Sequence, residues 1–553
     1  MCGIVAILAG SSAPAPVDQD EMLRMRERMT ARGPDGAGLW RSADGRIGLA
    51  HRRLSLSAAG PADAQPLVSN CGRYRLVFDG EIYNRQALRA EVQGRGVAVP
   101  SHGDAALGLE LYRHLGTDML VRLRGMFALA LWDEFRQCLL LARDCLGIKP
   151  LYLADDGHTL RAASQVKALL AGGAIDTAAD PAGHAGFFLW GHVPEPHTLY
   201  RAIRPLPAGS WLWAQTDGMR VSGRFFDPGR EMAMAAGRTA PGADVLRTSL
   251  QDSVGSHLAA AAAAAVLLGA GNAATLAAEV QGGSPRTLRV DFVGDGGEVP
   301  AAGNASRATR ITAADFTADH QLILDDMDQP SIGGVGLWYA ARAARQAGVR
   351  ALLSGMGGDG LFAAHDNFTL IPRMVAVLAP FALVPAVGRL ARRMMVPFAS
   401  GKVAGALEYG GRWGGAYLLR RGLVMPWDLH RVLDPDMARE GWEKLAALAA
   451  LKLATTGIGP ARLKVAALEG AIHLNGMLRD ADWAGMAHGV EIRTPLVDVD
   501  VLRVAWPQIA AAPVPMPAAD DAEAGCLAPV ARWRGDADLC GWARQVHQAF
   551  LNR

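Results

Sequence analysis

The sequence predicts two domains, a sheet-rich α+β N-terminal domain and a parallel α/β domain that ends in a helical C-terminal region. The chain has 553 residues, which is room for more than one domain at about 150 residues each. From residue 2 to 226, short β-branched and aromatic runs alternate with Gly and Pro, a pattern typical of strands and turns. From residue 245 onward, helical and strand-like segments alternate, which favours a parallel sheet.

In the first domain, predicted to span 1–226, the clearest strand signals are the runs 74–78 and 139–142. Residues 105–115 form a predicted helix. The segment 227–244 is rich in Gly, Ala and Pro and has no periodicity, so we predict a linker there.

The second domain, predicted to span 245–553, repeats a helix-and-strand order. Its predicted helices and strands are 245–264, 274–280 and 338–347 for helices, and 265–268, 288–293 and 350–353 for strands. Because one of these strands ends in a loop of small residues, the order indicates an open parallel sheet with its ligand site at the strand carboxyl ends. The remainder is rich in Ala and Leu and is predicted to be mostly helical.

The composition is that of a globular protein. Half of the residues are apolar, 20% are charged, and 56 Lys and Arg against 54 Asp and Glu leave a net charge of +2. We therefore expect no nucleic-acid partner. The six cysteines are scattered without CxxC spacing and the N-terminus has no basic signal-like region, so a reducing cytoplasmic location is expected. The histidines show no zinc-site spacing, and metal ligands stay unassigned.

The longest uncharged apolar run is 374–388, and it is interrupted by Pro380 and Pro385. It is shorter than the ~20 residues that span a bilayer, so we expect no transmembrane segment. Two interpretations remain open. A buried helix is the usual meaning of such a run, whereas the arginines that follow it also fit a helix on a membrane surface.

Cys2 carries chemistry that few residues can supply. If Met1 is removed, Cys2 holds a thiol and an α-amine, whose ordinary pKa values are about 8.5 and 8. The amine can then act as the base for the thiol, which suits attack on an amide and formation of a thioester. A cysteine at position 2 is by itself weak evidence for this chemistry.

The segments around Cys2 strengthen the case. They are MCGIVAIL, ARGPDGAGLW, LAHRRLSL, FDGEIYN, LRGMFALALWD and LLLARDCLGIKPLYL. In this order they resemble the glutaminase domain of class II glutamine amidotransferases, and specifically the glutamine-hydrolysing asparagine synthetases. The resemblance implies that the first domain is an N-terminal-nucleophile (Ntn) hydrolase, an αββα sandwich.

The resemblance also implies roles for single residues. Cys2 would be the nucleophile, and Arg53 would bind the α-carboxylate of glutamine. The backbone N–H of Gly80 would stabilise the oxyanion, and Glu81 and Asp104 would bind the α-amine. These roles agree with the chemistry of a free amino acid, which needs a guanidinium at one end and carboxylates at the other.

Four residues leave alternatives open. Arg52 and Arg53 also fit an ordinary surface pair, and Asp104 fits an N-cap of the predicted helix 105–115. Asp79 stands where the family usually has Asn as an oxyanion donor. An ionised Asp79 would repel the oxyanion, at a cost of about 3 kcal/mol, whereas burial beside other carboxylates would protonate it and restore a donor. We predict weakened glutaminase activity.

The resemblance continues in HLAAAAAAAVLLGAGNAATLAAEV, DQPSIGGVG, LLSGMGGDGLF and MLRDADWAGMAHGVEIRTPLVD. It implies a doubly wound parallel α/β domain of the ATP-pyrophosphatase (HUP) type, which uses ATP and Mg²⁺. A loop of small residues cradles phosphate because its backbone N–H groups can approach the anion. The implied ATP-site residues are Leu268, Gly269, Gly271, Thr275, Ser354, Gly355 and Asp359.

Several ionic groups that the family usually has are missing from this domain. Ala273, Gly333, Met356 and Gly360 stand where acidic residues are expected, and Asp480 stands where a Lys is expected. Mg²⁺ that accompanies ATP is held by carboxylates and phosphate oxygens. We therefore predict that the ATP-dependent half is impaired.

The leading functional hypothesis is a glutamine-dependent amidotransferase that transfers ammonia from Cys2 to an activated carboxylate. Aspartate or another carboxylate would be the acceptor, and a homodimer is conceivable. The alternatives are a non-catalytic scaffold and a glutaminase that works uncoupled from ATP.

Overall fold

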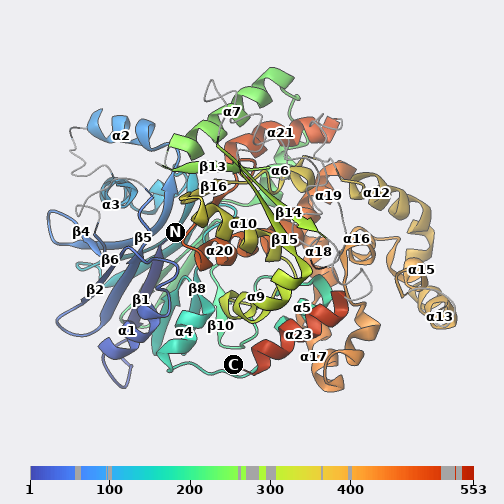
Figure 1. Cartoon of the computed structure of the whole chain (residues 1–553), viewed down its shortest axis with the longest axis horizontal. Coiled ribbons are helices and arrows are strands. Elements are labelled where there is room, and N and C mark those ends of the chain that lie inside the picture. Colours follow the sequence, from blue (N-terminus) through green and yellow to red (C-terminus); the bar gives the residue numbers. More distant parts are fainter. Residues whose placement is uncertain are drawn as a thin grey trace.

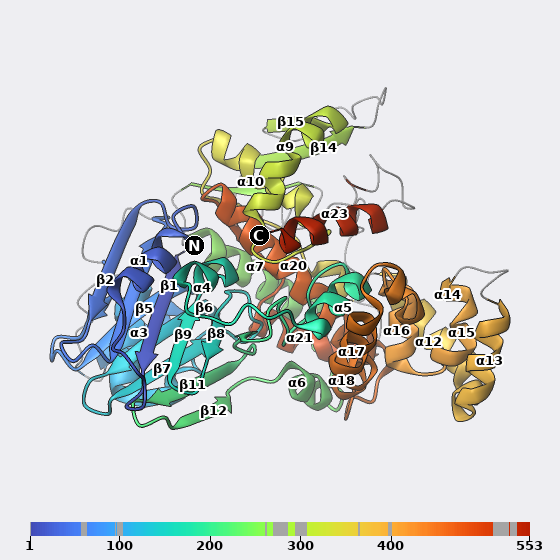
Figure 2. The same ribbon diagram turned by 90° about the horizontal axis from the view of Figure 1, so that it is seen from below.

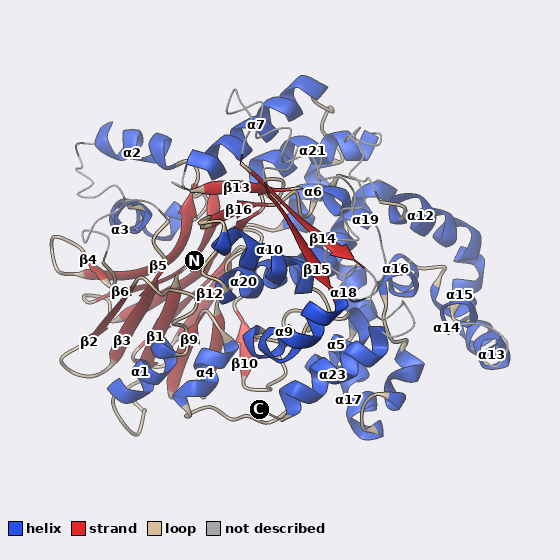
Figure 3. Cartoon of the chain, viewed as in Figure 1, coloured by secondary structure: helices blue, strands red, loops and turns tan. Residues whose placement is uncertain are grey.

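The computed structural model places two sheet-containing parts side by side and a helical region beyond them (Figures 1 and 3). It describes residues 2–56, 64–94, 96, 103–259, 263–268, 286–293, 307–362, 365–395, 401–511, 530 and 539–552.

The N-terminal part contains two antiparallel six-stranded sheets. The first has the order β10-β8-β9-β1-β3-β2 and the second has the order β12-β11-β7-β6-β5-β4. The strands of the first sheet are β1 (Gly3–Ala9), β2 (Gly36–Arg41), β3 (Ile47–Arg53), β8 (Tyr152–Asp155), β9 (Thr159–Ala163) and β10 (Ile203–Pro205). Those of the second are β4 (Leu67–Val68), β5 (Tyr74–Ile82), β6 (Gly125–Asp133), β7 (Cys138–Arg143), β11 (Ser210–Gln215) and β12 (Arg220–Arg224).

Alternation along the strands explains the four layers. In β1, Ile4 and Leu8 face the second sheet, and Val5 and Ile7 pack against helices α1 (Gln19–Glu27) and α4 (Val166–Gly172). Helices α2 (Arg85–Gly94) and α3 (Asp104–Leu115) cover the outer face of the second sheet. Because both faces of both sheets are covered, the strands are apolar on both sides. This is the predicted αββα sandwich of an Ntn hydrolase.

The C-terminal part is built on a five-stranded parallel sheet of order β15-β14-β13-β16-β17. Its strands are β13 (Ala264–Leu267), β14 (Thr287–Val293), β15 (Arg307–Thr312), β16 (Ala351–Leu353) and β17 (Glu491–Arg493). The strand order reverses direction between β13 and β16, as in a doubly wound domain, and this topology predicts a ligand crevice at the carboxyl ends of these two strands. The predicted fold class is confirmed.

Helices make up most of the remaining structure. They are α5 (Pro181–Trp190), α6 (Pro228–Ala235), α7 (Ala243–Ala259), α9 (Ala313–Asp326), α10 (Val335–Gln346), α11 (Gly358–Leu361), α12 (Asn367–Leu378), α13 (Pro385–Met395), α14 (Gly401–Ala404), α15 (Ala406–Tyr409), α16 (Trp413–Arg421), α17 (Pro435–Leu445), α18 (Ala447–Ala454), α19 (Ala461–Glu469), α20 (Asn475–Ala487), α21 (Val499–Ala511) and α23 (Leu539–Leu551). Short η2 (Gly116–Met119), η3 (Ala379–Leu383), η4 (Pro426–Arg431) and η5 (Gly470–Leu474) join them.

The predicted elements correspond closely to the observed ones. The strand runs 74–78 and 139–142 lie within β5 and β7, and the predicted strand 265–268 is β13 displaced by one residue. The predicted helix 274–280 lies outside the described residues. Part of the predicted linker, 227–244, forms helix α6, which Asp227 caps by accepting from the Arg230 backbone N–H.

The expectation of a buried helix at the apolar run 374–388 is wrong. The run lies in α12, η3 and α13, where Val377 is 71% exposed and Leu383 is 82% exposed. In the described part of the chain no single helix is long and apolar enough to cross a membrane, although α12 with η3 and α13 form one bent pair that meets the length and composition limits together.

Candidate functional site

Cys2 directly precedes β1, the strand whose inner side packs against the second sheet. Its backbone N–H donates to Asp79 Oδ1 at 2.7 Å, and its carbonyl oxygen accepts from Arg32 Nε. Burial raises the pKa of the Cys2 thiol, and the charge of Asp79 raises it further. The thiol is therefore protonated at neutral pH, so a base must remove its proton before it can attack.

Asp79, on β5, is completely buried beside Cys2. Its Oδ2 accepts from Arg32 Nη2 at 2.7 Å, and Lys149 Nζ lies 3.9 Å from Oδ1. Burial acts to raise the pKa of Asp79, but the positive charges of Lys149 and Arg32 outweigh it, so the pKa lies below its ordinary value.

The ionised state of Asp79 corrects the idea that protonation restores an oxyanion donor. A carboxylate can only accept hydrogen bonds. At 2.7 Å from the nitrogen of Cys2, it also stabilises the ammonium form of a free amine there, which makes that amine a weaker base. Both effects weaken attack by the Cys2 thiol.

Gly80 follows Asp79 on β5 with a φ of 147°. A Cβ at this position would lie 2.0 Å from the carbonyl oxygen of Met126 on the neighbouring strand β6. Only glycine therefore fits, because the backbone here approaches its neighbour too closely for a side chain. This close packing fixes the strand that carries Asp79 and Glu81 on either side of Gly80.

The two carboxylates predicted to bind the glutamine amine lie together at the end of β5. Asp104 Oδ2 accepts from the Ile82 backbone N–H at 2.8 Å, and Arg85 Nη2 donates to Glu81 at 2.7 Å. Burial and the charge of Glu81 raise the pKa of Asp104 to about 7. The N-cap interpretation of Asp104 is wrong, because Gly103 is the N-cap of α3.

The neighbouring arginines on β3 differ in their surroundings. Arg52 pairs with Glu27 at 2.7 Å near the surface, as the surface-pair alternative expects. Arg53 is half-buried at the end of β3 and lies against Gly36 of β2. Its role toward the glutamine carboxylate stays a prediction.

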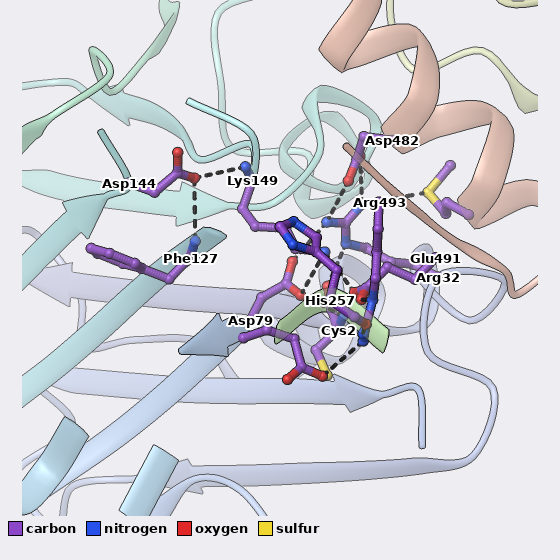
Figure 4. Close-up of polar contacts among 12 residues, drawn as sticks. Cys2, Arg32, Asp79, Phe127, Asp144, Lys149, His257, Asp482, Glu491 and Arg493 are labelled. Atoms are coloured by element: carbon purple, nitrogen blue, oxygen red, sulfur yellow. Dashed lines mark hydrogen bonds and ion pairs between the residues drawn. The ribbon is translucent and has the colours of Figure 1, made fainter. Parts of the chain in front are cut away.

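Residues of the C-terminal part complete the surroundings of Cys2 (Figure 4). Arg32 donates to Asp482 on α20 at 2.6 Å, so one guanidinium joins Asp79 to the other domain. Lys149 Nζ donates to Glu491 on β17 at 2.8 Å. The loop that carries Lys149 is held by Asp144, which accepts from the Lys149 backbone N–H at 2.9 Å.

Arg493 adds a second connection between the domains. This fully buried residue of β17 donates to Glu491 at 2.8 Å and to Glu81 at 3.0 Å. The residues missed by sequence reasoning are Arg32, Lys149, Asp482, Glu491 and Arg493. All five lie within the motif segments quoted above, so the motifs themselves were the available signal.

The implied ATP-site residues are only partly described. Leu268 directly follows β13 and donates its backbone N–H to the Leu288 carbonyl at 2.8 Å, whereas Gly269, Gly271 and Thr275 lie outside the described residues. Ser354 is buried just after β16, and its Oγ accepts from the Met356 backbone N–H at 3.2 Å.

The other two implied ATP-site residues are Gly355, which is next to Ser354, and Asp359, which comes a few residues later. The Gly355 carbonyl accepts from Gly358 N–H at 3.2 Å. The backbone of Asp359 lies in α11, but its side chain is outside the described part. Ser354 and Gly355 therefore lie at the carboxyl end of β16, where the sheet order reverses.

Two of the substituted positions touch each other. A Cβ at Gly333 would lie 2.5 Å from Asp480 Oδ2, so the Asp480 carboxylate occupies the space of the missing side chain. Asp480 accepts from Ser331 Oγ at 3.0 Å and from Trp483 Nε1 at 2.9 Å. Burial raises the pKa of Asp480 to about 6. The Asp480 carboxylate of α20 thus lies where a side chain at position 333 would begin.

The described residues contain no cluster of three acidic, histidine or cysteine side chains able to hold a metal ion. Mg²⁺ arrives with ATP largely on phosphate oxygens and needs only one or two carboxylates.

Fold and site together define an Ntn-type glutaminase joined to an ATP-using α/β synthetase domain. Family models agree: a glutamine amidotransferase domain matches residues 1–226 and an asparagine synthase domain matches residues 245–509. The chain belongs to the family of glutamine-hydrolysing asparagine synthetases, and it is a glutamine-dependent amidotransferase and ligase of that type.

Individual relatives cover most or part of the chain. A Mycobacterium tuberculosis protein provisionally named a glutamine-hydrolysing asparagine synthetase is 31% identical over 91% of this chain and 81% of its own length. Asparagine synthetase B of Escherichia coli is 37% identical over 45% of this chain and 39% of its own length.

Proposed function

We propose that Cys2 hydrolyses glutamine and that the C-terminal domain uses ATP to attach the released ammonia to aspartate or another carboxylate. The observation that supports this most directly is the position of Cys2. It begins β1 opposite the Asp79–Gly80–Glu81 run of β5, inside a sandwich. This position supports roles for Cys2 as the nucleophile, for the Gly80 backbone N–H as the oxyanion donor and for the nearby carboxylates as the binders of the amino acid.

The proposed chemistry begins at the thiol. The Cys2 Sγ attacks the side-chain carboxamide carbon of glutamine, and its proton passes to the α-amine of Cys2. The backbone N–H of Gly80 stabilises the oxyanion. As the intermediate collapses, the α-ammonium of Cys2 returns its proton to the leaving nitrogen, which departs as ammonia and leaves a thioester. Water then hydrolyses the thioester to glutamate and regenerates the thiol. Arg53, Glu81 and Asp104 hold the two charged ends of glutamine.

The synthetase half is proposed to occupy the crevice after β13 and β16. Leu268 follows β13, Ser354 and Gly355 follow β16, and the backbone of Asp359 lies in α11. Asp480 compensates in part for the acidic group absent at Gly333. ATP would activate the acceptor carboxylate by adenylation and release pyrophosphate, and ammonia would displace AMP.

We assign residues 1–226 to the glutaminase domain, 227–244 to the linker and 245–553 to the synthetase domain. A cytoplasmic location is proposed because the five cysteines that the structure describes are free thiols. A homodimer stays a prediction that light scattering of the purified chain tests.

A product assay tests the proposed function. The full chain is incubated with glutamine, ATP, Mg²⁺ and aspartate, and glutamate, AMP and asparagine are followed together. Equal formation of all three supports the proposal with aspartate as acceptor. If a different carboxylate yields AMP and its own amide, the result supports the proposal with that carboxylate as the acceptor. Glutamate without AMP for every acceptor contradicts the synthetase half, and no glutamate contradicts the role of Cys2.

A further inference from the structure

A helical lobe stands apart from both sheets at one edge of the molecule (Figure 2). It consists of α12, η3, α13 and the short helices α14 and α15. The axis turns by 112° between the segments Asn367–Leu383 and Ala386–Met395. A large exposed apolar patch on a protein often marks a surface that binds another protein or a membrane.

One face of α13 and the preceding turn is both apolar and open. Leu383 is 82% exposed, Leu390 is 61% exposed and Met394 is 68% exposed. Val387 lies on the same face, since helical residues three or four apart are neighbours. Leu383, Val387, Leu390 and Met394 therefore follow one line along the segment. The exposed apolar side chains of this part of the chain, which we call the lobe face, are Val377, Phe381, Leu383, Val384, Val387, Leu390 and Met394.

The opposite side of α13 is tied to the lobe. A Cβ at Gly388 would lie 2.6 Å from the backbone of Glu408, so α13 and α15 are in close contact there. Arg392 pairs with Glu408 at 2.6 Å and its guanidinium lies over the Trp427 ring at 4.6 Å. Because these contacts fix the inner side, the apolar face is held outward.

The charge around the lobe face has one sign. Between residues 367 and 407 the sequence has five Lys and Arg and no Asp or Glu, and the acidic residue of the lobe, Glu408, is paired with Arg392 on the inner side of α13. Arg373, Arg389 and Arg393 are exposed beside the apolar side chains. An outward apolar face with cationic side chains around it is the pattern of a helix that lies in the interface of an anionic membrane.

We propose that the lobe face docks the protein on an anionic lipid surface, with its apolar side chains among the acyl chains and its arginines against the lipid phosphates. A second copy of the chain fits less well, because it would bring a like-charged lobe into contact. The bend between α12 and α13 suits a segment that lies on the surface rather than one that crosses it.

Vesicle sedimentation of the full chain tests this proposal. The vesicles contain phosphatidylcholine alone or mixed with phosphatidylglycerol. We expect binding to the mixed vesicles, weaker binding at high salt and little binding to phosphatidylcholine. Absence of binding to the mixed vesicles, or equal binding to both kinds, would overturn the proposal.

Matched variants test whether vesicle binding depends on the lobe face rather than on nonspecific adsorption of exposed apolar side chains. Leu383→Glu combined with Leu390→Glu should reduce vesicle affinity by at least about tenfold, and so should Arg389→Glu combined with Arg393→Glu. Leu453→Glu is the control, because Leu453 is 75% exposed on α18 away from the lobe. Equal binding by all variants would place the contact elsewhere and overturn the proposal. The proposal would also be overturned if light scattering showed a dimer that the substitutions in the lobe face dissociate. Glutaminase activity is not expected to change, so this test is independent of the proposed function.

Discussion

The ion pair between Arg32 and Asp79 joins two side chains that have no exposed surface, with Nη2 and Oδ2 2.7 Å apart. Arg32 also pairs with Asp482 at 2.6 Å. One guanidinium therefore balances a carboxylate beside the nucleophile and a carboxylate of the synthetase domain. The substitution of Asn by Asp at position 79 is accommodated as a charge in this network.

Replacing Arg32 should be costly. Arg32→Met leaves Asp79 and Asp482 without their guanidinium partner in a buried region, so we expect the free energy of unfolding to fall by about 3–5 kcal/mol. Urea denaturation followed by tryptophan fluorescence measures it. Arg439→Met is the control, since Arg439 and Asp436 form an exposed pair that should contribute less than about 1 kcal/mol. Equal effects of the two substitutions would argue against a buried network.

Cys2 should be the thiol that a glutamine analogue modifies. A glutamine-shaped chloroketone should label Cys2, and excess glutamine should protect it. Cys2→Ala should abolish labelling and lower glutamate release by at least about a thousandfold. Cys71 is the control, because it is exposed and the Ser69 hydroxyl lowers the pKa of its thiol, which makes it reactive toward general alkylators. Mass spectrometry that finds the analogue on Cys71 alone, or Met1 still attached, would contradict the mechanism.

Glutamine binding should strengthen as the pH rises through about 7, the pKa of Asp104. Below this pH Asp104 is neutral, and above it the carboxylate attracts the α-ammonium group of glutamine. Its pKa is raised on folding, so its deprotonation also lowers stability as the pH rises through the same range. The KM for glutamine measured across this range should fall in the wild type and stay flat in Asp104→Asn. An unchanged pH dependence in the variant would show that another group is responsible.

The contact between Gly333 and Asp480 predicts a specific rescue. Gly333→Asp alone places a second acidic side chain 2.5 Å from Asp480 Oδ2, and we expect a loss of about 1–3 kcal/mol in the free energy of unfolding. Adding Asp480→Lys should recover stability by pairing the two charges. Gly237→Asp is the control, because a Cβ there meets nothing within 4 Å. If calorimetry shows no recovery of stability in the double variant, the Asp480 carboxylate does not occupy the place of a side chain at position 333.

The sequence was sufficient to predict both sheet-containing parts and the positions of Cys2, Gly80 and Glu81, because they lie in long ordered motifs. It could not predict the charge state of Asp79, which depends on Arg32, 47 positions away in the chain. The partner of Lys149 is 342 positions away. The first contact arises when distant segments of the N-terminal domain pack together and the second when the two domains pack, and no local periodicity reports either of them.

The exposure of the apolar lobe and the existence of strand β17 also could not be predicted from the sequence. Periodicity cannot distinguish an apolar run that packs inside from one that faces outward, since both have the same residues at the same spacing. Strand β17 has only the residues Glu491–Arg493, two of them charged. It is too short to show a strand pattern, yet it places Glu491 and Arg493 in the interdomain network.

The glutaminase rate of Asp79→Asn tests the central claim most directly. An amide at this position can donate to the oxyanion and no longer stabilises the ammonium form of Cys2, while Arg32 keeps Asp482 and Lys149 keeps Glu491 as partners. We predict that Asp79→Asn releases glutamate from glutamine about 10- to 100-fold faster than the wild type. A variant that is slower than the wild type, with its fold intact, would contradict the account.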